Sequence, residues 1–139
     1  MTFFSNIGPD LSSNMQPSTT KFSSYLGQTV ENNFIFCRVT PELVLDISQK
    51  MKSKLSCGPD NISSKLLKSI IPIIIQPFYH LFNLSFQTGY IPQQFKTAKV
   101  VPVYKSGDEH NYTNYRPIGL LSSFPKLLEK VVAKQMAQF

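Results

Sequence analysis

Basic side chains are the groups in this sequence best placed to do chemistry, and Arg116 stands out among them. It lies where a polar loop leads into an apolar stretch, and Lys105 follows a run of strand-forming residues. If the two stretches pair as a hairpin, Lys105 and Arg116 lie near the same end of it. A guanidinium binds phosphate in a forked geometry and a lysine adds a second positive charge, so the pair could hold a phosphate. A salt bridge from Arg116 to Asp108 or Glu109 is an equally weighted alternative.

The charge of the chain is unevenly distributed. Its 14 basic and 8 acidic residues give a net charge of +6. Lys21 and Arg38 balance Asp10 and Glu31 in the first forty residues, so the whole excess lies in residues 41–139. A positive field of this kind favours polyanions, such as nucleic acid, nucleotides or an anionic membrane. A solvated basic surface without a ligand is the alternative.

The other groups that can react or bind metals are scattered along the sequence. The cysteines and histidines stand far apart, at Cys37, Cys57, His80 and His110. Neither a structural zinc site nor a disulfide framework is therefore expected. The sequence has no Gly-x-Ser-x-Gly elbow, no Walker-type phosphate loop and no dinucleotide fingerprint. No cluster of carboxylates suited to two metal ions is expected either. We predict no catalytic residue, no metal site and no cofactor in this chain.

Residues 70–86 form the most apolar segment, and prolines and polar residues interrupt it. The interruptions are Pro72, Gln76, Pro77, His80 and Asn83. Because such residues are costly in hydrocarbon, the segment is typical of a buried helix and not of a membrane span. The first residues do not have the pattern of a signal peptide. We expect an intracellular protein without a membrane, and leave nucleus or cytoplasm open.

The first half of the chain predicts a lead-in followed by helices. Residues 1–33 are rich in Ser, Thr, Asn and Gly and have no sustained period, which predicts a poorly ordered lead-in or linker. Residues 34–39 are a short extended candidate. Thr40 can cap the next helix, which has Pro41 in its first position. The apolar face of that helix is predicted to be Leu43, Val44, Ile47 and Met51.

The stretch CGPDN, residues 57–61, is predicted to be a structural turn and cap. We expect Gly58 to adopt unusual backbone angles, Pro59 to stop the helix and Asp60 to cap the next one. Pro72 should end or kink that second helix, whose apolar residues are Ile62, Leu66, Leu67 and Ile70. A third helix is expected over residues 73–87, ended by Gly89.

The second half predicts a hairpin and a last helix. Valines and tyrosine at 100–104 favour a strand, residues 105–108 favour a turn, and 115–121 can return as the partner, with Pro117 near its beginning. The last helix has its apolar face at Phe124, Leu127, Leu128, Val131, Val132 and Met136. No stop signal follows, so this helix is expected to continue to Phe139. The fold class is therefore α+β, helix-rich, with one antiparallel strand pair.

Taken together, three ordered stretches resemble the reverse transcriptases of non-LTR (LINE-like) retrotransposons. They are KSKLSCGPDNISSKLLK at 52–68, LFNLSFQTGYIPQQFKTAKVVPVYKSGD at 81–108 and NYTNYRPIGLLSSFPKLLEKVV at 111–132. Residues 2–11 and 34–44 resemble the linker that precedes the polymerase. The sequence departs from the family pattern at Asn61, where Gly is usual, at Phe95 (Trp), at Cys57 (Pro) and at Gly119 (Ser).

The resemblance implies that residues 34–139 are part of the fingers of a right-hand polymerase, truncated before the palm. It implies contacts with a triphosphate or a template backbone, for which we name Lys54, Lys99, Lys105 and Arg116. The turn at Gly58, Pro59 and Asp60 would shape the path of the template. The implied partners are an RNA or DNA template, a dNTP and the missing palm.

The resemblance also implies what this sequence lacks. The catalytic aspartates of the family, which hold Mg²⁺ in the complete enzyme, lie on a downstream palm strand and in a Tyr-x-Asp-Asp hairpin, so we expect no polymerisation by this chain alone. The alternatives are a stand-alone basic nucleic-acid-binding module and a protein-interaction domain derived from such an enzyme.

Overall fold

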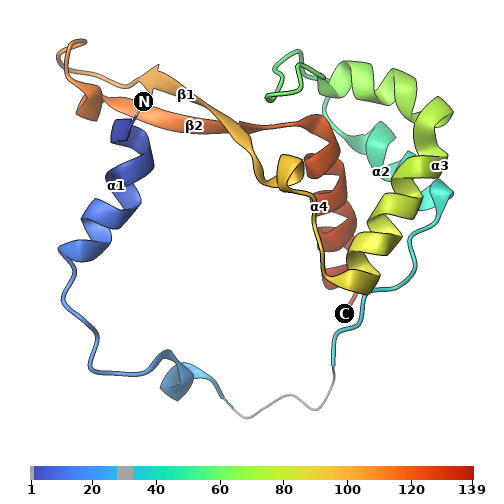
Figure 1. The fold of residues 1–139 in the computed structure, drawn as a ribbon, viewed down its shortest axis with the longest axis horizontal. Helices are drawn as coiled ribbons and strands as arrows, with labels where there is room; N and C mark the ends of the chain where they lie inside the picture. The colour runs from blue at the N-terminus through green and yellow to red at the C-terminus, as the bar shows by residue number, and fades with distance from the viewer. Residues whose placement is uncertain (1, 28–32) are drawn as a thin grey trace. The chain divides into compact units, whose positions relative to one another are not determined.

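The structure is a computed structural model that describes residues 2–27 and 33–139 (Figure 1). Residue 1 and residues 28–32, which belong to the expected lead-in, lie outside the described part. The chain divides into two compact units. The helical unit comprises Phe34–Val101 and Ile118–Phe139, and the hairpin-tip unit comprises Met1–Asn33 and Pro102–Pro117. The strand pair β1 (Ala98–Tyr104) and β2 (Tyr115–Leu121) contributes residues to both units.

The helical unit is built from three helices that pack on one another, α2 (Pro41–Lys50), α3 (Ser64–Thr88) and α4 (Ser123–Met136). Their inward faces form a single apolar core of Val39, Val44, Ile47, Met51, Leu67, Ile71, Phe82, Leu127, Leu128 and Val131. Each buried side chain of this size contributes roughly 1.5–3 kcal/mol. The predicted faces of the first and last helices are thus confirmed in their central positions. The helix-rich α+β class is confirmed as well.

The amino end of α2 follows the sequence prediction. Thr40 has extended backbone angles and its Oγ1 accepts a hydrogen bond from the backbone N–H of Leu43 at 3.3 Å. Pro41 occupies the first helical position, where its missing N–H costs nothing. Hydrogen bonding of the Glu42 carboxylate with its own backbone amide, and then with the Thr40 side chain, lowers the pKa of Glu42 in the first turn.

The two helices predicted on either side of Pro72 form the two arms of one kinked helix, α3. The kink is at Ile74, whose angles are φ −106° and ψ 16°. Ile74 lies in the turn that precedes Pro77, and a proline disturbs the turn before it because its ring crowds the preceding carbonyls. We therefore attribute the kink to Pro77. Pro72 lies inside the helix without ending it. Gly89 ends the helix in the left-handed conformation, at φ 68°, as predicted.

By length and composition alone α3 could cross a membrane. In the structure it supplies Leu67, Ile71 and Phe82 to the core, and the side-chain amide of Asn83 binds the backbone of the extended segment. One face of α3 therefore packs in the core of the helical unit.

The last helix ends before the chain does. α4 was expected to continue to Phe139, but it ends at Met136. The backbone N–H of Ala137 still donates to the carbonyl of Ala133 at 3.0 Å, and that of Gln138 donates to Gln135 at 3.2 Å. The final bond spans only three residues, so the helix tightens at its end.

Two side-chain amides hold the extended segment 34–39 against the helices. Asn83 of α3 accepts from the N–H of Val39 at 2.8 Å and donates to its carbonyl at 2.9 Å. Gln135 of α4 does the same for Cys37, at 2.8 and 3.1 Å. Each side-chain amide supplies one acceptor for the backbone N–H and one donor for the backbone carbonyl of an extended residue. The segment is therefore held in place without a partner strand.

The hairpin-tip unit contains a helix that the sequence analysis did not predict, α1 (Thr2–Ser13). Gly8 and Pro9 are helix breakers, and both lie inside it. A short 3-10 turn, Phe22–Tyr25, follows. Within this unit the rings of Phe3 and Tyr112 lie 6.1 Å apart. Loose ordering of residues 1–33 in solution stays a prediction.

Candidate nucleic-acid interface

The strand pair brings the two central basic residues to one end of a hairpin. β1 and β2 are neighbours in a two-stranded sheet. Just beyond the strand ends, the backbone N–H of Lys105 donates to the carbonyl of Asn114 at 2.9 Å. The rings of Tyr104 and Tyr115 lie 5.5 Å apart one step further in. The predicted hairpin is confirmed, and Lys105 and Arg116 lie at the same end of it.

The alternation of side chains along the strands places both cations on one face. Lys105 lies opposite Asn114, and Tyr104 opposite Tyr115, so Arg116 lies opposite Val103. Residues two apart on a strand share a face, so Lys105, Val103 and Arg116 point the same way. Diagonal neighbours of this kind are about 7–8 Å apart at the backbone, within reach of long side chains that converge on one group.

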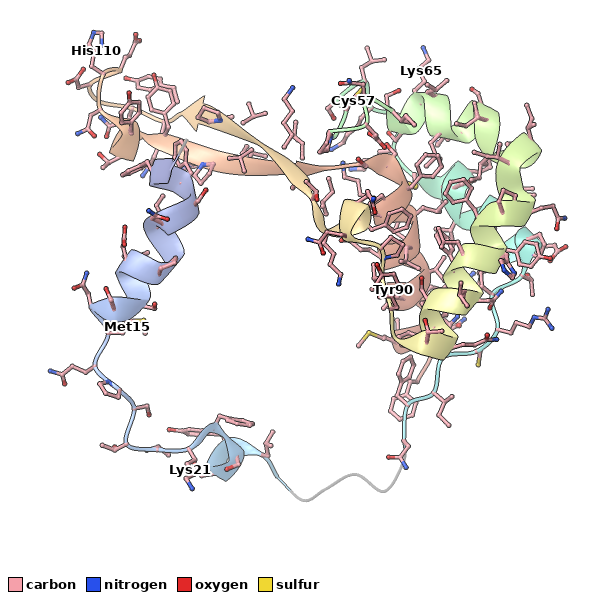
Figure 2. All side chains as sticks on the ribbon, in the orientation of Figure 1. Met15, Lys21, Cys57, Lys65, Tyr90 and His110 are labelled. Atoms are coloured by element: carbon pink, nitrogen blue, oxygen red, sulfur yellow. The ribbon has the colours of Figure 1, made fainter. Side chains whose placement is uncertain are left out.

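Local hydrogen bonds hold the loop at the tip, and one of them uses a carboxylate oxygen. Asp108 Oδ1 accepts from the backbone N–H of His110 at 2.9 Å. The backbone carbonyls of Asp108 and Glu109 accept from Asn114 Nδ2 and from the hydroxyl of Tyr115, both at 2.9 Å. Figure 2 labels His110 in this loop.

The only side-chain ion pairs among residues 2–27 and 33–139 are those of Asp46, so the salt bridge weighed for Arg116 is not formed there. Both cations are exposed. A guanidinium keeps its charge at any physiological pH, so this face of the hairpin carries a permanent positive charge.

Lys54 and Lys99, the other two predicted contacts, belong to the helical unit. Lys99 is an exposed residue of β1. Lys54 lies after α2, where its backbone N–H donates to the buried hydroxyl of Ser64 at 2.9 Å. The structure therefore brings Lys105 and Arg116 together within one unit, and it describes Lys54 and Lys99 within the other. Pro117 is exposed in β2 and costs little there, because both strands of a two-stranded sheet have a free edge.

The turn at residues 58–62 differs from its prediction in three ways. The preceding helix α2 already ends at Lys50, so Pro59 does not stop it. Asp60 does not cap α3. Its Oδ1 accepts from the backbone N–H of Ile62 at 3.0 Å, which closes a local turn, and Ser63 caps the helix by accepting from Leu66 at 3.1 Å. An aspartate bonds its own backbone two residues on as readily as it caps a helix, and Ser63 is closer to the first turn. The left-handed residue is Asn61, at φ 57°, and not Gly58.

Gly58 is needed because two backbone segments approach closely. A Cβ built on Gly58 would lie 2.6 Å from Ser122 Cα and 2.7 Å from the carbonyl carbon of Leu121. Ser123 Oγ donates to the carbonyl of Ile62 at 2.9 Å across the same junction. The turn is thus fastened to the point where β2 leads into α4. The partners are about sixty residues apart in sequence, so no spacing rule could have revealed this contact.

Comparison with known proteins gives the chain its relatives, although no family model matches it. It is 32% identical over 102 residues to a probable RNA-directed DNA polymerase from transposon BS of Drosophila melanogaster, which covers 70% of the chain and 11% of that protein. It is 25% identical over 113 residues to the RNA-directed DNA polymerase from mobile element jockey of the same species. This match covers 81% of the chain and 12% of that protein. A Retrovirus-related Pol polyprotein from type-1 retrotransposable element R1 of Bradysia coprophila is 30% identical over 97 residues. This match covers 68% of the chain and 10% of that protein.

These matches relate the chain by sequence to retrotransposon RNA-directed DNA polymerases. Within that class, it is homologous to a segment of the polymerases of non-LTR elements, as the three ordered stretches of the sequence indicated. The chain spans about a tenth of the length of the curated relatives it matches.

Proposed function

We propose that this chain is a fingers segment of a retrotransposon RNA-directed DNA polymerase, and that its hairpin contacts a nucleic-acid template or an incoming nucleotide. The observation that carries the proposal is the pair of exposed cations on one hairpin face, Lys105 and Arg116, neither of which has an ion-pair partner among the described residues. The names of the relatives supply the class of ligand. Lys54 and Lys99 are proposed as further contacts, and the turn at 58–60 as a guide for the template.

Binding of a labelled single-stranded RNA to the 139-residue chain, measured by fluorescence anisotropy at several salt concentrations, tests the hairpin. Replacing Lys105 and Arg116 with Gln removes two cations, so the slope of log affinity against log salt should fall by about 1.4. Lys65→Gln/Lys68→Gln on α3 removes the same charge elsewhere and is the control. An equal effect of the two double variants would refute a specific role for the hairpin.

Catalysis is proposed to require residues outside this chain. Among residues 2–27 and 33–139, no three His, Cys, Asp or Glu side chains gather where a metal ion could bind. This donor set does not fit the two Mg²⁺ ions of a nucleotidyl transferase, so the palm of a complete enzyme would supply the ligands. In a template-dependent incorporation assay with Mg²⁺ and dNTPs, the chain should give no product above a no-protein control. Template-dependent product would overturn this part of the proposal.

A stand-alone nucleic-acid-binding module is the second candidate. The observation that favours it is the apolar core of the helical unit, which buries ten residues. A cooperative thermal melt of monomeric protein together with salt-dependent RNA binding would favour this candidate. Binding to an acidic protein without RNA binding would instead favour a protein-interaction domain.

A further inference from the structure

A second basic surface lies on the helical unit, at the groove between α2 and α4. The groove contains a shallow hollow of about 260 Å³ lined by Asp46, Ile47, Lys50, Lys130, Ala133 and Lys134. One carboxylate faces three ammonium groups there. Asp46 bonds Lys50 at 2.7 Å and Lys134 at 3.5 Å, and Lys130 has no ion-pair partner among the described residues. The hollow therefore has an excess of positive charge.

Lys126 continues this surface along α4. Lys126, Lys130 and Lys134 are spaced four residues apart, which places them on one helix face at intervals of about 6 Å. The row is therefore about 12 Å long. One nucleic-acid strand carries a phosphate every 3.4 Å of axial rise, so about three or four phosphates span the same length. Lysines about 6 Å apart would therefore meet about every second phosphate of such a strand.

Helix stability does not explain the row. Lysines near the carboxyl ends of their helices, such as Lys50 and Lys134, are favoured by the helix dipole. Lys126 lies instead near the amino end of α4, where a cation is disfavoured. Like charges at this spacing also destabilise a helix by about 0.2–0.5 kcal/mol for each pair, and the row contains two such pairs. Glu129, the nearest carboxylate in sequence, forms no ion pair with them in the described structure.

We infer that this surface, the α2–α4 lysine row of Lys50, Lys126, Lys130 and Lys134, binds the phosphate backbone of a nucleic acid. A phosphate in the hollow would meet Lys130 and the lysines that now share Asp46, above a floor formed by Ala133 and Ile47. The inference shares its ligand class with the proposed function, but uses none of the hairpin residues. Asp46 competes with a phosphate for this surface, because it already forms ion pairs with two of the four lysines, Lys50 and Lys134.

This role of Asp46 gives an unusual test, a gain of binding on removal of a charge. Asp46→Asn should raise the affinity of the chain for a labelled 20-nucleotide oligouridylate, because it releases Lys50 and Lys134. Each additional phosphate contact should steepen the salt dependence by about 0.7 and add up to about eightfold in affinity at 50 mM salt. Lys126→Gln/Lys130→Gln should change both quantities in the opposite direction. Lys130→Gln alone, at an exposed position, gives a smaller loss and is the variant to use should the double variant fold poorly.

The control and the neighbouring site separate the outcomes. Lys65→Gln/Lys68→Gln loses the same charge from α3 and should have the smaller effect. If it weakens binding as much as Lys126→Gln/Lys130→Gln, or if Asp46→Asn fails to strengthen binding, the inference is wrong. Competition by polyglutamate as strong as that by RNA, at equal charge, would assign the surface to an acidic protein and also overturn it. The Lys105→Gln/Arg116→Gln variant is measured in parallel, so failure of the hairpin and failure of the lysine row are distinguished.

Discussion

Replacing Gly58 with Ala should destabilise the helical unit more than any other single methyl addition at a glycine of the chain. The new Cβ would stand about 1 Å inside normal contact distance of Ser122 Cα and of the Leu121 carbonyl carbon. Both atoms belong to the backbone, so no side chain can turn aside. The turn at 58–62 must therefore move away from the start of α4.

The cost has two parts. Overpacking of a close contact costs about 1–3 kcal/mol. The movement also pulls the carbonyl of Ile62 away from Ser123 Oγ, now 2.9 Å apart, and Ser123 is 2% exposed. A buried hydroxyl that loses its partner costs about 1–3 kcal/mol. The sum is roughly 2–6 kcal/mol, a large part of the 5–15 kcal/mol that stabilises a typical domain.

Urea unfolding followed by circular dichroism measures this change through the transition midpoint. Gly119→Ala is the matched control, since its Cβ would meet only the Ala98 side chain at 3.8 Å, an ordinary contact. It should leave stability within about 0.5 kcal/mol of the parent. A Gly58→Ala protein as stable as the Gly119→Ala control would refute the close-approach argument.

Substitutions at three further positions test other parts of the structure. Asn61 has a left-handed backbone, so Asn61→Gly should be neutral or slightly stabilising and Asn61→Val should cost about 1–2 kcal/mol in urea unfolding. Asn83→Leu leaves the N–H and carbonyl of buried Val39 without partners, and should cost about 2–4 kcal/mol by the same measurement. Asn83→Asp should cost less, because an acceptor for the Val39 N–H remains. The hydrogen bond from Lys50, with the charges of Lys50 and Lys134, lowers the pKa of Asp46. The ionised carboxylate therefore stabilises the folded chain fully above the ordinary aspartate pKa of 3.8. This contribution is lost as the pH falls through the lowered pKa of the folded state. Asp46→Asn should therefore reduce the acid dependence of the unfolding free energy; an unchanged pH profile would count against the pair.

The sequence predicted elements that depend on local pattern. The apolar face of α2, with its threonine cap and first-position proline, was readable because every signal lies within one helix. The hairpin was readable from strand-forming residues on both sides of a polar turn. The position of Lys105 and Arg116 at one end of that hairpin followed from these local signals alone.

What the sequence could not predict depends on contacts between distant residues or on competition between neighbours. Asp60 and Ser63 can both cap a helix, and only the position of the first helical turn decides between them. The requirement for Gly58 arises from Ser122, which no periodicity connects to it. The lysine row on α4 did have a local signal in its four-residue spacing. Its charge excess became visible only when α2 brought Asp46 and Lys50 beside it.

The hairpin tip presents Lys105 and Arg116 at the surface, outside any buried site. A two-stranded hairpin is marginally stable by itself, and most residues of β1 and β2 are exposed. The loop is therefore held by its own polar groups, since Asp108, Asn114 and Tyr115 all bond to nearby backbone. One of these bonds engages Asp108 Oδ1, an oxygen that could otherwise pair with Arg116. If a phosphate binds there, it joins two cations already on the same face and should stabilise the hairpin by mass action. Protection of the tip amides from hydrogen exchange by added oligonucleotide would reveal this stabilisation, and unchanged exchange at saturating oligonucleotide would contradict it.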